Sequence, residues 1–179
     1  MPTVRVTAGT LRGRRIPVPP ADVRPTSERA RQAFFNILGD RIAGARFLDL
    51  FSGSGVFSFE ALSRGAASTL AIDSSRRNIE TITRLAKELQ VAVATMTSDV
   101  LKALAMLGDQ TFDVAYADPP YDYAHYDELA AALAGKAGLF AIEHRKGTHP
   151  FTGQAAIARR AEYGEVWITL FESQGESWN

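Results

Sequence analysis

From residue 46 onwards, short apolar segments alternate with segments of helical periodicity, and this alternation limits the possible folds more than any other feature of the sequence. Each apolar segment has the length of a β-strand, and each segment between two of them repeats apolar residues at helical spacing. The predicted strands are 47–51, 69–72, 91–96, 112–117, 139–142, 155–158 and 166–171. Alternating strands and helices form βαβ units, so we expect an α/β fold with a doubly wound, mostly parallel, Rossmann-like sheet of seven strands.

The first 25 residues have a different pattern and predict a β-hairpin arm. Two short extended segments flank Gly9 and Gly13, which mark turns, and a Pro-rich stretch follows them. Thr26 and Ser27 then supply helix caps before an apolar stripe that predicts the first helix. We therefore divide the 179-residue chain into an arm (1–25) and a domain (26–179).

Composition excludes several classes of protein. With 46% apolar and 22% charged residues, the chain matches a globular domain, and it lacks an apolar run of the ~18 residues that span a membrane. It has no cysteine, so disulfides, thiolate metal sites and cysteine nucleophiles are excluded, and the three histidines lack metal-ligand spacing. We expect a cytoplasmic protein without a membrane partner or a bound metal.

The net charge of zero hides an asymmetry. Residues 1–46 contain nine Arg and three acidic residues, whereas the remaining chain carries a net charge of −6. All the basic residues of this segment are Arg, whose planar guanidinium suits phosphate better than an ammonium does. The N-terminal segment is therefore expected to contact a polyanion.

Four carboxylates lie at the ends of four successive predicted strands: Asp49, Asp73, Asp99 and Asp118. Ligands of doubly wound sheets bind beyond the carboxyl ends of the strands, so we expect these side chains to face one ligand rich in hydrogen-bond donors and positive charge. Gly53 and Gly55 let the backbone turn tightly beside that ligand.

The cofactor class follows from the same residues. Ser58 stands where a dinucleotide fingerprint has its third glycine, and the Gly-Lys-Ser/Thr of a P-loop is absent, so NAD and ATP are disfavoured. Asp73, about twenty residues after the glycine turn, suits ribose hydroxyls, and Asp99 suits an adenine amino group. S-adenosylmethionine combines a ribose, an adenine and a cationic end without a phosphate.

The segment Asp118-Pro119-Pro120-Tyr121 predicts the substrate site. Two prolines fix φ and bias Asp118 towards an extended conformation, which holds a carboxylate and an aromatic ring at a fixed separation. That arrangement suits a planar substrate with an amino group, which Tyr121 can stack against and Asp118 can bind.

These motifs resemble the class I S-adenosylmethionine-dependent methyltransferases, and the chain is most similar to the RsmD family. The resemblance rests on the loop 49–55, on Asp-Pro-Pro-Tyr, and on segments 9–14, 24–36, 60–66 and 163–164. It implies methylation of a guanine N2 in bacterial 16S ribosomal RNA within an assembling small subunit. Asp73 departs from the family, which usually has Glu there, as do Leu85 and Ala86, where many relatives carry Asn.

The resemblance also implies the site residues. The catalytic set is Asp118, Pro119, Pro120 and Tyr121, and the cofactor-binding set is Asp49, Phe51, Ser52, Gly53, Ser54, Gly55, Asp73, Asp99 and Val100. The predicted RNA-binding residues are Arg12, Arg14, Arg24, Thr26, Arg29 and Arg31. Two alternatives stay open: an N-methyltransferase of DNA adenine or of a protein glutamine amide, and a non-catalytic RNA-binding assembly module.

Overall fold

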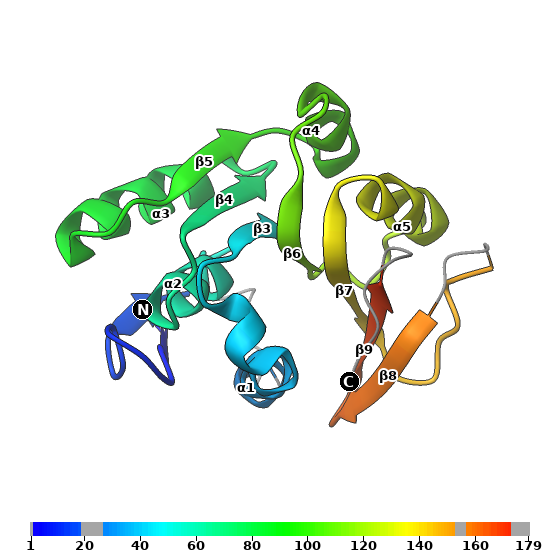
Figure 1. The fold of residues 1–179 in the computed structure, drawn as a ribbon, viewed down its shortest axis with the longest axis horizontal. Coiled ribbons are helices and arrows are strands. Elements are labelled where there is room, and N and C mark those ends of the chain that lie inside the picture. Colours follow the sequence, from blue (N-terminus) through cyan, green and yellow to red (C-terminus); the bar gives the residue numbers. More distant parts are fainter. Residues whose placement is uncertain (1, 19–26, 153–156, 173–179) are drawn as a thin grey trace.

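The computed structural model describes residues 2–18, 27–152 and 157–172, and its centre is a seven-stranded sheet (Figure 1). The strand order is β5-β4-β3-β6-β7-β9-β8, in which the first five strands are parallel and β9 is antiparallel to both of its neighbours. The strands are β3 (Arg46–Leu50), β4 (Ser68–Asp73), β5 (Ala94–Thr97), β6 (Phe112–Ala117), β7 (Ala137–Arg145), β8 (Ile157–Tyr163) and β9 (Val166–Glu172).

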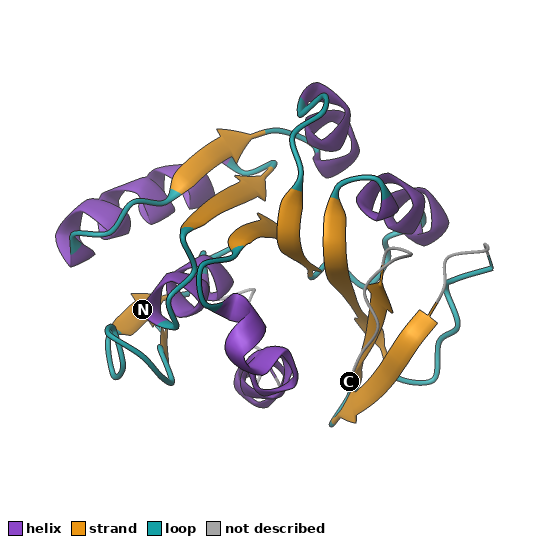
Figure 2. Ribbon diagram, viewed as in Figure 1, coloured by secondary structure: helices purple, strands orange, loops and turns teal. Residues whose placement is uncertain are grey.

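Helices cover both faces of this sheet (Figure 2). One face carries α1 (Ser27–Leu38), the short 3₁₀ helix η2 (Gly39–Ile42), α2 (Val56–Ser63) and α3 (Arg76–Leu89), and the other carries α4 (Val100–Met106) and α5 (Tyr126–Ala134). This confirms the predicted α/β, doubly wound, mostly parallel fold. No helix in the described ranges is long and apolar enough to cross a membrane.

Three strands differ from their predicted ranges by more than one residue. Strand β5 starts at Ala94 rather than at 91, because Gln90 ends α3 in a left-handed conformation and Val91 still donates to Ala86 of that helix. Strand β7 extends well beyond 139–142, because it pairs with both β6 and β9. The predicted strand 155–158 corresponds to the start of β8, and residues 153–156 lie outside the described residues.

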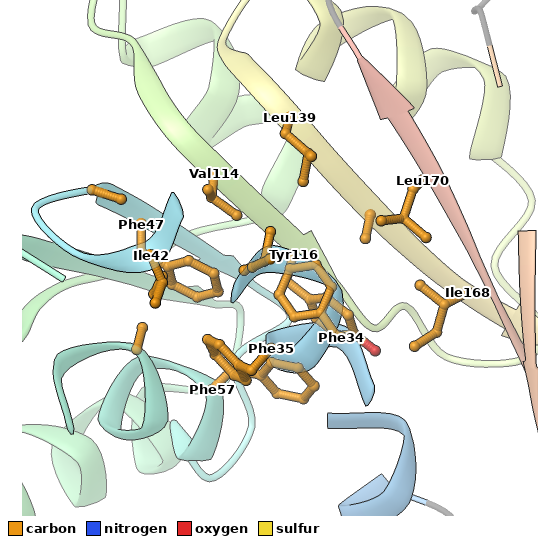
Figure 3. Packing of buried hydrophobic residues seen from close by; sticks show 14 of the residues in the cluster. Phe34, Phe35, Ile42, Phe47, Phe57, Val114, Tyr116, Leu139, Ile168 and Leu170 are labelled. Atoms are coloured by element: carbon orange, nitrogen blue, oxygen red, sulfur yellow. The ribbon is translucent and has the colours of Figure 1, made fainter. Parts of the chain in front are cut away.

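An aromatic cluster fastens the helices to the strands that carry the predicted site (Figure 3). Phe57 of α2 stacks on Tyr116 of β6 with the ring centroids 3.9 Å apart, and Phe34 of α1 approaches Tyr116 at 4.7 Å. Phe35 and Phe47 close the same cluster and are fully buried. Because these rings interdigitate, the ends of β3 and β6 have a rigid support.

The N-terminal hairpin exists as predicted and packs against the domain. Strands β1 (Thr3–Arg5) and β2 (Arg15–Pro17) pair antiparallel, and Leu11 and Ile16 join a buried cluster with residues of α2 and α3. Gly9 permits this contact, since it has a φ of +77° and a Cβ there would lie 1.6 Å from the Ser63 carbonyl oxygen. The division of the chain at residue 25 stays a prediction, since residues 19–26 lie outside the described residues.

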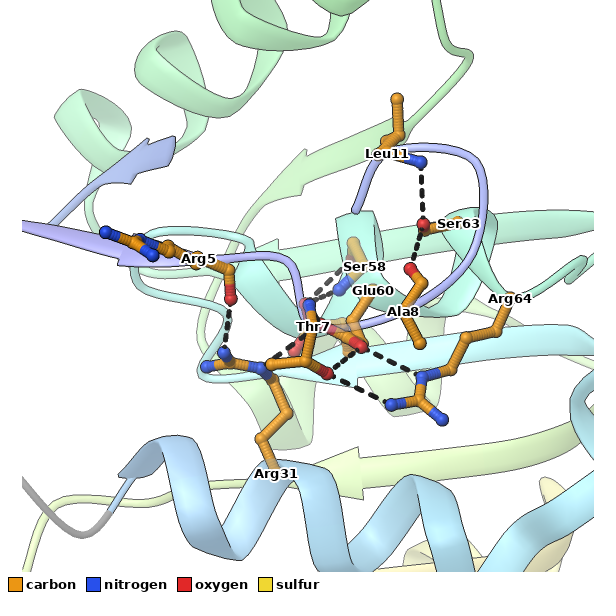
Figure 4. Close-up of polar contacts among 10 residues, drawn as sticks. Arg5, Thr7, Ala8, Leu11, Arg31, Ser58, Glu60, Ser63 and Arg64 are labelled. Carbon is orange, nitrogen blue, oxygen red and sulfur yellow. Dashed lines mark hydrogen bonds and ion pairs between the residues drawn. The ribbon is translucent and has the colours of Figure 1, made fainter. Parts of the chain in front are cut away.

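Glu60 of α2 organises the polar part of this contact (Figure 4). Its side chain is fully buried, accepts a hydrogen bond from the Thr7 backbone N–H at 2.8 Å, and forms ion pairs with Arg64 at 2.9 Å and with Arg31 at 3.5 Å. Arg31 donates in turn to the Arg5 carbonyl at 2.7 Å. One carboxylate therefore links the hairpin, α1 and α2.

We predict that Glu60→Ala lowers the free energy of unfolding by ~3–5 kcal/mol, because it leaves the Arg31 guanidinium buried without a counter-charge. The measurement is urea denaturation of the full chain. The matched control is Glu80→Ala, which removes an exposed ion pair of α3, Arg76–Glu80, also at 2.9 Å, and is expected to cost ~0.5 kcal/mol or less. Equal losses in the two variants would contradict a structural role for the Glu60 network.

Candidate active site at the carboxyl edge of the sheet

A cavity of about 310 Å³ opens where the strand order reverses. Strand β3 lies between β4 and β6, so the chain leaves β3 towards one edge of the sheet and returns through β6 towards the other. The loops after β3 and β6 diverge at this point and leave a crevice, which is the usual ligand site of a doubly wound sheet. The lining residues are Val4, Val18, Asp49, Phe51, Ser52, Gly53, Ser54, Val56, Phe57, Asp73, Ser74, Asn78, Asp99, Val100, Tyr116, Asp118 and Pro120.

The loop after β3 has the backbone conformation that its glycines predict. Gly53 and Gly55 have φ of +52° and +75°, and Phe51 has a φ of +56°, which is uncommon for a residue with a bulky side chain. A Cβ on Gly55 would lie 2.7 Å from Cγ1 of Ile82 in α3, so the loop also depends on glycine for close packing. Left-handed residues at this point turn the backbone sharply into α2 beside the cavity.

Asp49 lies at the base of the cavity and is almost completely buried. Its Oδ2 accepts hydrogen bonds from the Ser58 hydroxyl at 2.7 Å and from the Ser58 backbone N–H at 3.0 Å. Burial raises the pKa of Asp49 from 3.8 to about 7, a shift that the Ser58 hydrogen bonds oppose and the charges of Asp73 and Asp118 reinforce. A ligand cation beside this carboxylate would favour its charged form.

Ser58 also has a structural role beside the cavity. In the sequence, Ser58 excludes a dinucleotide fingerprint, and in the folded chain it is buried as the hydrogen-bond partner of Asp49. Both interpretations follow from one fact, namely that a polar side chain occupies the position where the fingerprint has a glycine.

Asp73 and Asp99 also line the cavity, and each has a structural role as well. Asp73 accepts from the Gly53 N–H at 2.8 Å and from the Ser75 N–H at 2.7 Å, so it ties the glycine loop to the end of β4. Asp99 caps α4 by accepting from the Lys102 N–H at 3.1 Å, and it stays exposed. Their assignment to ribose and adenine stays a prediction.

The Asp-Pro-Pro-Tyr segment follows β6 and is only partly in the cavity. Asp118 and Pro120 line it, whereas Pro119 is buried behind it and Tyr121, 46% exposed, lies outside the lining. The Asp118 N–H donates to the Leu50 carbonyl at 3.4 Å, which holds this turn against the end of β3. Of the predicted cofactor residues, Gly55 alone is not among the lining residues, and its contribution is to the backbone turn.

The structure adds lining residues that sequence reasoning missed. Tyr116 precedes Asp118 by two positions, so the period of a strand places both on one side of β6, a signal that could have identified it. Its hydroxyl donates to the buried Glu143 carboxylate of β7 at 2.7 Å. Val4 and Val18 belong to the hairpin, whose docking position has no local signal in the sequence.

The predicted RNA-binding residues differ in their surroundings. Arg12, Arg14 and Arg29 are exposed. The prediction for Arg31 is wrong, because its side chain is fully buried between α1 and the hairpin, and burial lowers its pKa. Arg24 and Thr26 lie outside the described residues.

The described part of the chain contains no cluster of metal ligands. Within residues 2–18, 27–152 and 157–172, no group of three or more His, Asp or Glu side chains is arranged to hold a metal ion. His144 contacts Thr148 and Thr169, and His125 contacts Glu128. The cavity itself offers carboxylate oxygens, apolar walls and glycine backbone, which suit an organic ligand with cationic and hydroxyl groups.

Comparison with known proteins agrees with this geometry. A family model described as Conserved hypothetical protein 95 matches residues 4–172. Ribosomal RNA small subunit methyltransferase D of Escherichia coli K12 is 31% identical over 185 residues, which are 97% of this chain and 93% of the relative. The solved structure of yhhF from Escherichia coli superposes with a TM-score of 0.85 at 27% identity, covering 98% of this chain and all of that one.

A more distant solved structure bears on the fold alone. The protein SMU.776, solved in complex with S-adenosylhomocysteine, has a TM-score of 0.69 at 15% identity and matches 84% of this chain and 50% of its own.

The raised pKa of Asp49 predicts a pH-dependent stability. Between pH 3.8 and about 7 the folded chain keeps a proton on Asp49 that the unfolded chain releases, so this group lowers the free energy of unfolding progressively as pH rises through that range. Asp49→Asn cannot titrate. The stability of the variant relative to the wild type should therefore increase across the same range and level off above it.

The measurement is urea denaturation of both proteins at several pH values. The comparison between them cancels His144, whose pKa burial lowers to about 4 and which changes stability in the opposite direction. A difference that does not change with pH would show that Asp49 titrates normally.

Proposed function

The chain belongs to the RsmD family of ribosomal RNA methyltransferases, and on that basis we propose that it transfers a methyl group from S-adenosylmethionine to the exocyclic N2 amine of a guanine in 16S ribosomal RNA. The observation that carries the proposal is the position of Asp118, on the wall of one cavity that also contains Asp49, Asp73 and Asp99. A carboxylate suited to the substrate amine therefore lies beside three carboxylates suited to the cofactor.

The residues present fit S-adenosylmethionine. When bound, this cofactor supplies a methyl group on a sulfonium, which is a good leaving group and needs neither a metal nor a covalent nucleophile. Asp49, buried and close to the charges of Asp73 and Asp118, would pair with a cationic group. Asp73 and Asp99 can each accept further hydrogen bonds, which suits ribose hydroxyls and an adenine amine. SMU.776, a protein of the same fold, was solved with S-adenosylhomocysteine, so this fold accommodates the product of that cofactor.

The Asp-Pro-Pro-Tyr turn would position the guanine amine that accepts the methyl group. The lone pair of a guanine amine is delocalised into its ring, so the enzyme gains most from holding the N–H groups and aligning the nitrogen with the methyl group. Asp118 accepts from the amine, and its charge favours the positive charge that develops on nitrogen during transfer. The guanine must leave its stack to reach this wall, and Tyr121 is exposed to receive it.

We further propose that the substrate is 16S ribosomal RNA within an assembling small subunit, as the family implies. The exposed Arg12, Arg14 and Arg29 belong to the +6 segment and suit its phosphates. The direct test uses tritiated S-adenosylmethionine and small-subunit particles from a strain that lacks this gene. Label recovered as N2-methylguanosine supports the proposal, and label in another nucleoside, or none, contradicts it.

Two substitutions of Asp118 separate the effect of its hydrogen bond from the effect of its charge. We predict that Asp118→Ala lowers kcat by about 10²- to 10³-fold, because the acceptor for the amine is lost in the transition state. Asp118→Asn keeps an acceptor oxygen but loses the charge, so its kcat should lie between those of Asp118→Ala and the wild type.

The measurement is initial-rate methyl transfer, with S-adenosylhomocysteine affinity by calorimetry as the control, since cofactor binding should change little in either variant. Near wild-type turnover in Asp118→Ala would contradict the catalytic assignment.

The exposed arginines give a prediction about salt. Replacing Arg12, Arg14 and Arg29 with Ala should weaken RNA binding and flatten the plot of log affinity against log salt by ~0.7 for each lost phosphate contact. S-adenosylhomocysteine affinity should stay unchanged. The matched control replaces three exposed arginines of α3 instead: Arg76, Arg77 and Arg84. If both triple variants show the wild-type slope, the N-terminal arginines do not contact RNA.

A further inference from the structure

A cluster of aromatic and basic side chains lies on the antiparallel part of the sheet, apart from the +6 segment. It comprises His144 at the end of β7, His149 and Phe151 in the following loop, Arg160 of β8 and Trp167 of β9, and we call it the aromatic rim. Pairing across the strands places Arg160 opposite Thr169, and His144 opposite Trp167, on the face that α5 covers (Figure 1).

Arg160 is held in a defined position on this rim. Its guanidinium carbon lies 5.1 Å from the centre of the Trp167 ring, its Nη1 is 3.3 Å from His149 Nδ1, and its Nε donates to the Thr169 hydroxyl at 3.5 Å. The His149 ring also lies against Trp167, at 5.5 Å. Arg160 and His149 are exposed and Trp167 is half-buried, so the guanidinium faces solvent above a partly covered ring.

Ring contacts connect the rim to the active-site cavity without a gap. Phe51 lines the cavity and contacts Tyr123 at 5.2 Å, and Tyr123 contacts Tyr126 of α5 at 5.4 Å. Tyr126 contacts Phe151 at 5.7 Å. His144 then joins Phe151 at 5.4 Å to Trp167 at 6.0 Å. The rim therefore lies on the same side of the molecule as the loop that carries Tyr121 and Tyr123.

The charges around the rim favour an anionic partner. Arg160 is exposed, as is Lys146 directly after β7. Arg145 and Arg159 are also exposed, but they alternate with His144 and Arg160 along β7 and β8 and therefore lie on the opposite face of the sheet. Lys146 shares its charge with Glu162 at 3.7 Å, so the positive charge on the rim itself comes from Arg160. The rim thus combines exposed guanidinium with aromatic rings inside a segment of the chain whose net charge is −6.

We propose that the aromatic rim binds single-stranded nucleotides of the RNA next to the methylated guanine, with a base stacked on the Arg160 guanidinium over Trp167. The inference rests on the proposed function and extends it to a second contact with the RNA. Bases that have left a helix stack on arginine planes and aromatic rings, with phosphates held by nearby cations. A guanine that has flipped out of its stack has unstacked nucleotides next to it on both sides in the RNA chain.

Two adjacent arginines of β8 supply a matched test. Arg160 lies on the rim, whereas Arg159 pairs with Leu170 and lies on the opposite face of the strand. Arg160→Ala should raise the KM for undermethylated 16S ribosomal RNA about tenfold, which equals ~1.4 kcal/mol, with little change in kcat. Arg159→Ala should leave KM within about twofold of wild type, or ~0.4 kcal/mol. Arg160→Lys keeps the charge without the planar group and should recover only part of the loss.

Tryptophan fluorescence gives an independent readout. The chain has two tryptophans, so Trp178→Phe leaves Trp167 as the sole reporter. A short single-stranded oligoribonucleotide should quench this emission, and the quenching should weaken in Arg160→Ala. S-adenosylhomocysteine affinity in every variant shows that the cavity is intact.

The outcomes separate the two proposals. If the wild type fails to methylate RNA, the proposed function is wrong, and the fluorescence titration still decides whether the rim binds RNA. If the wild type is active while Arg160→Ala matches Arg159→Ala in KM and in quenching, the rim proposal is overturned. A loss confined to assembled particles, with naked RNA unaffected, would also overturn it, since the rim would then face a ribosomal protein.

Discussion

The parallel pairing of β3 with both β4 and β6 is the constraint on which the rest of the structure depends. Parallel strands in register end at one edge of the sheet, so Asp49, Asp73 and Asp118 converge although more than forty residues separate Asp73 from Asp118. The reversal of strand order at β3 then leaves a crevice beside these carboxylates. The buried stack of Phe57 on Tyr116 keeps the two loops of this crevice at a fixed separation.

The N-terminal hairpin is part of this site as well as a surface for a polyanion. Val4 and Val18 line the cavity, while Arg12 and Arg14 are exposed on the turn between the two strands of the hairpin. Docking of the hairpin depends on Glu60, whose buried carboxylate binds the hairpin backbone and two arginines. An ionic interaction outside the cavity lining therefore holds part of the cavity wall.

The sequence predicted the structure correctly wherever a local pattern is compatible with only one local structure. Alternating strand and helix periodicities predicted seven strands, and the positions of Asp49 and Asp118 directly at strand ends predicted which edge carries the site. It was a poor guide to side chains whose partners are distant in the sequence. Arg31 belongs to an Arg-rich segment and was assigned to RNA, but Glu60 and the Arg5 carbonyl bury it. Tyr116 was treated only as part of a strand and Glu143 lay just beyond the predicted strand 139–142, and only the folded chain shows the buried hydrogen bond between them.

The sequence by itself determined the architecture, the glycine turn, the rigid Asp-Pro-Pro-Tyr segment and the family, because these depend on periodicity, backbone restriction and spacing within short stretches. Tertiary structure alone decided which arginines are exposed, how the hairpin closes the cavity, and how Arg160, His149 and Trp167 meet. The physical reason is the same in each case. Burial and ion pairing depend on contacts between elements far apart in the chain, and the free energy of such a contact is not encoded in either segment alone.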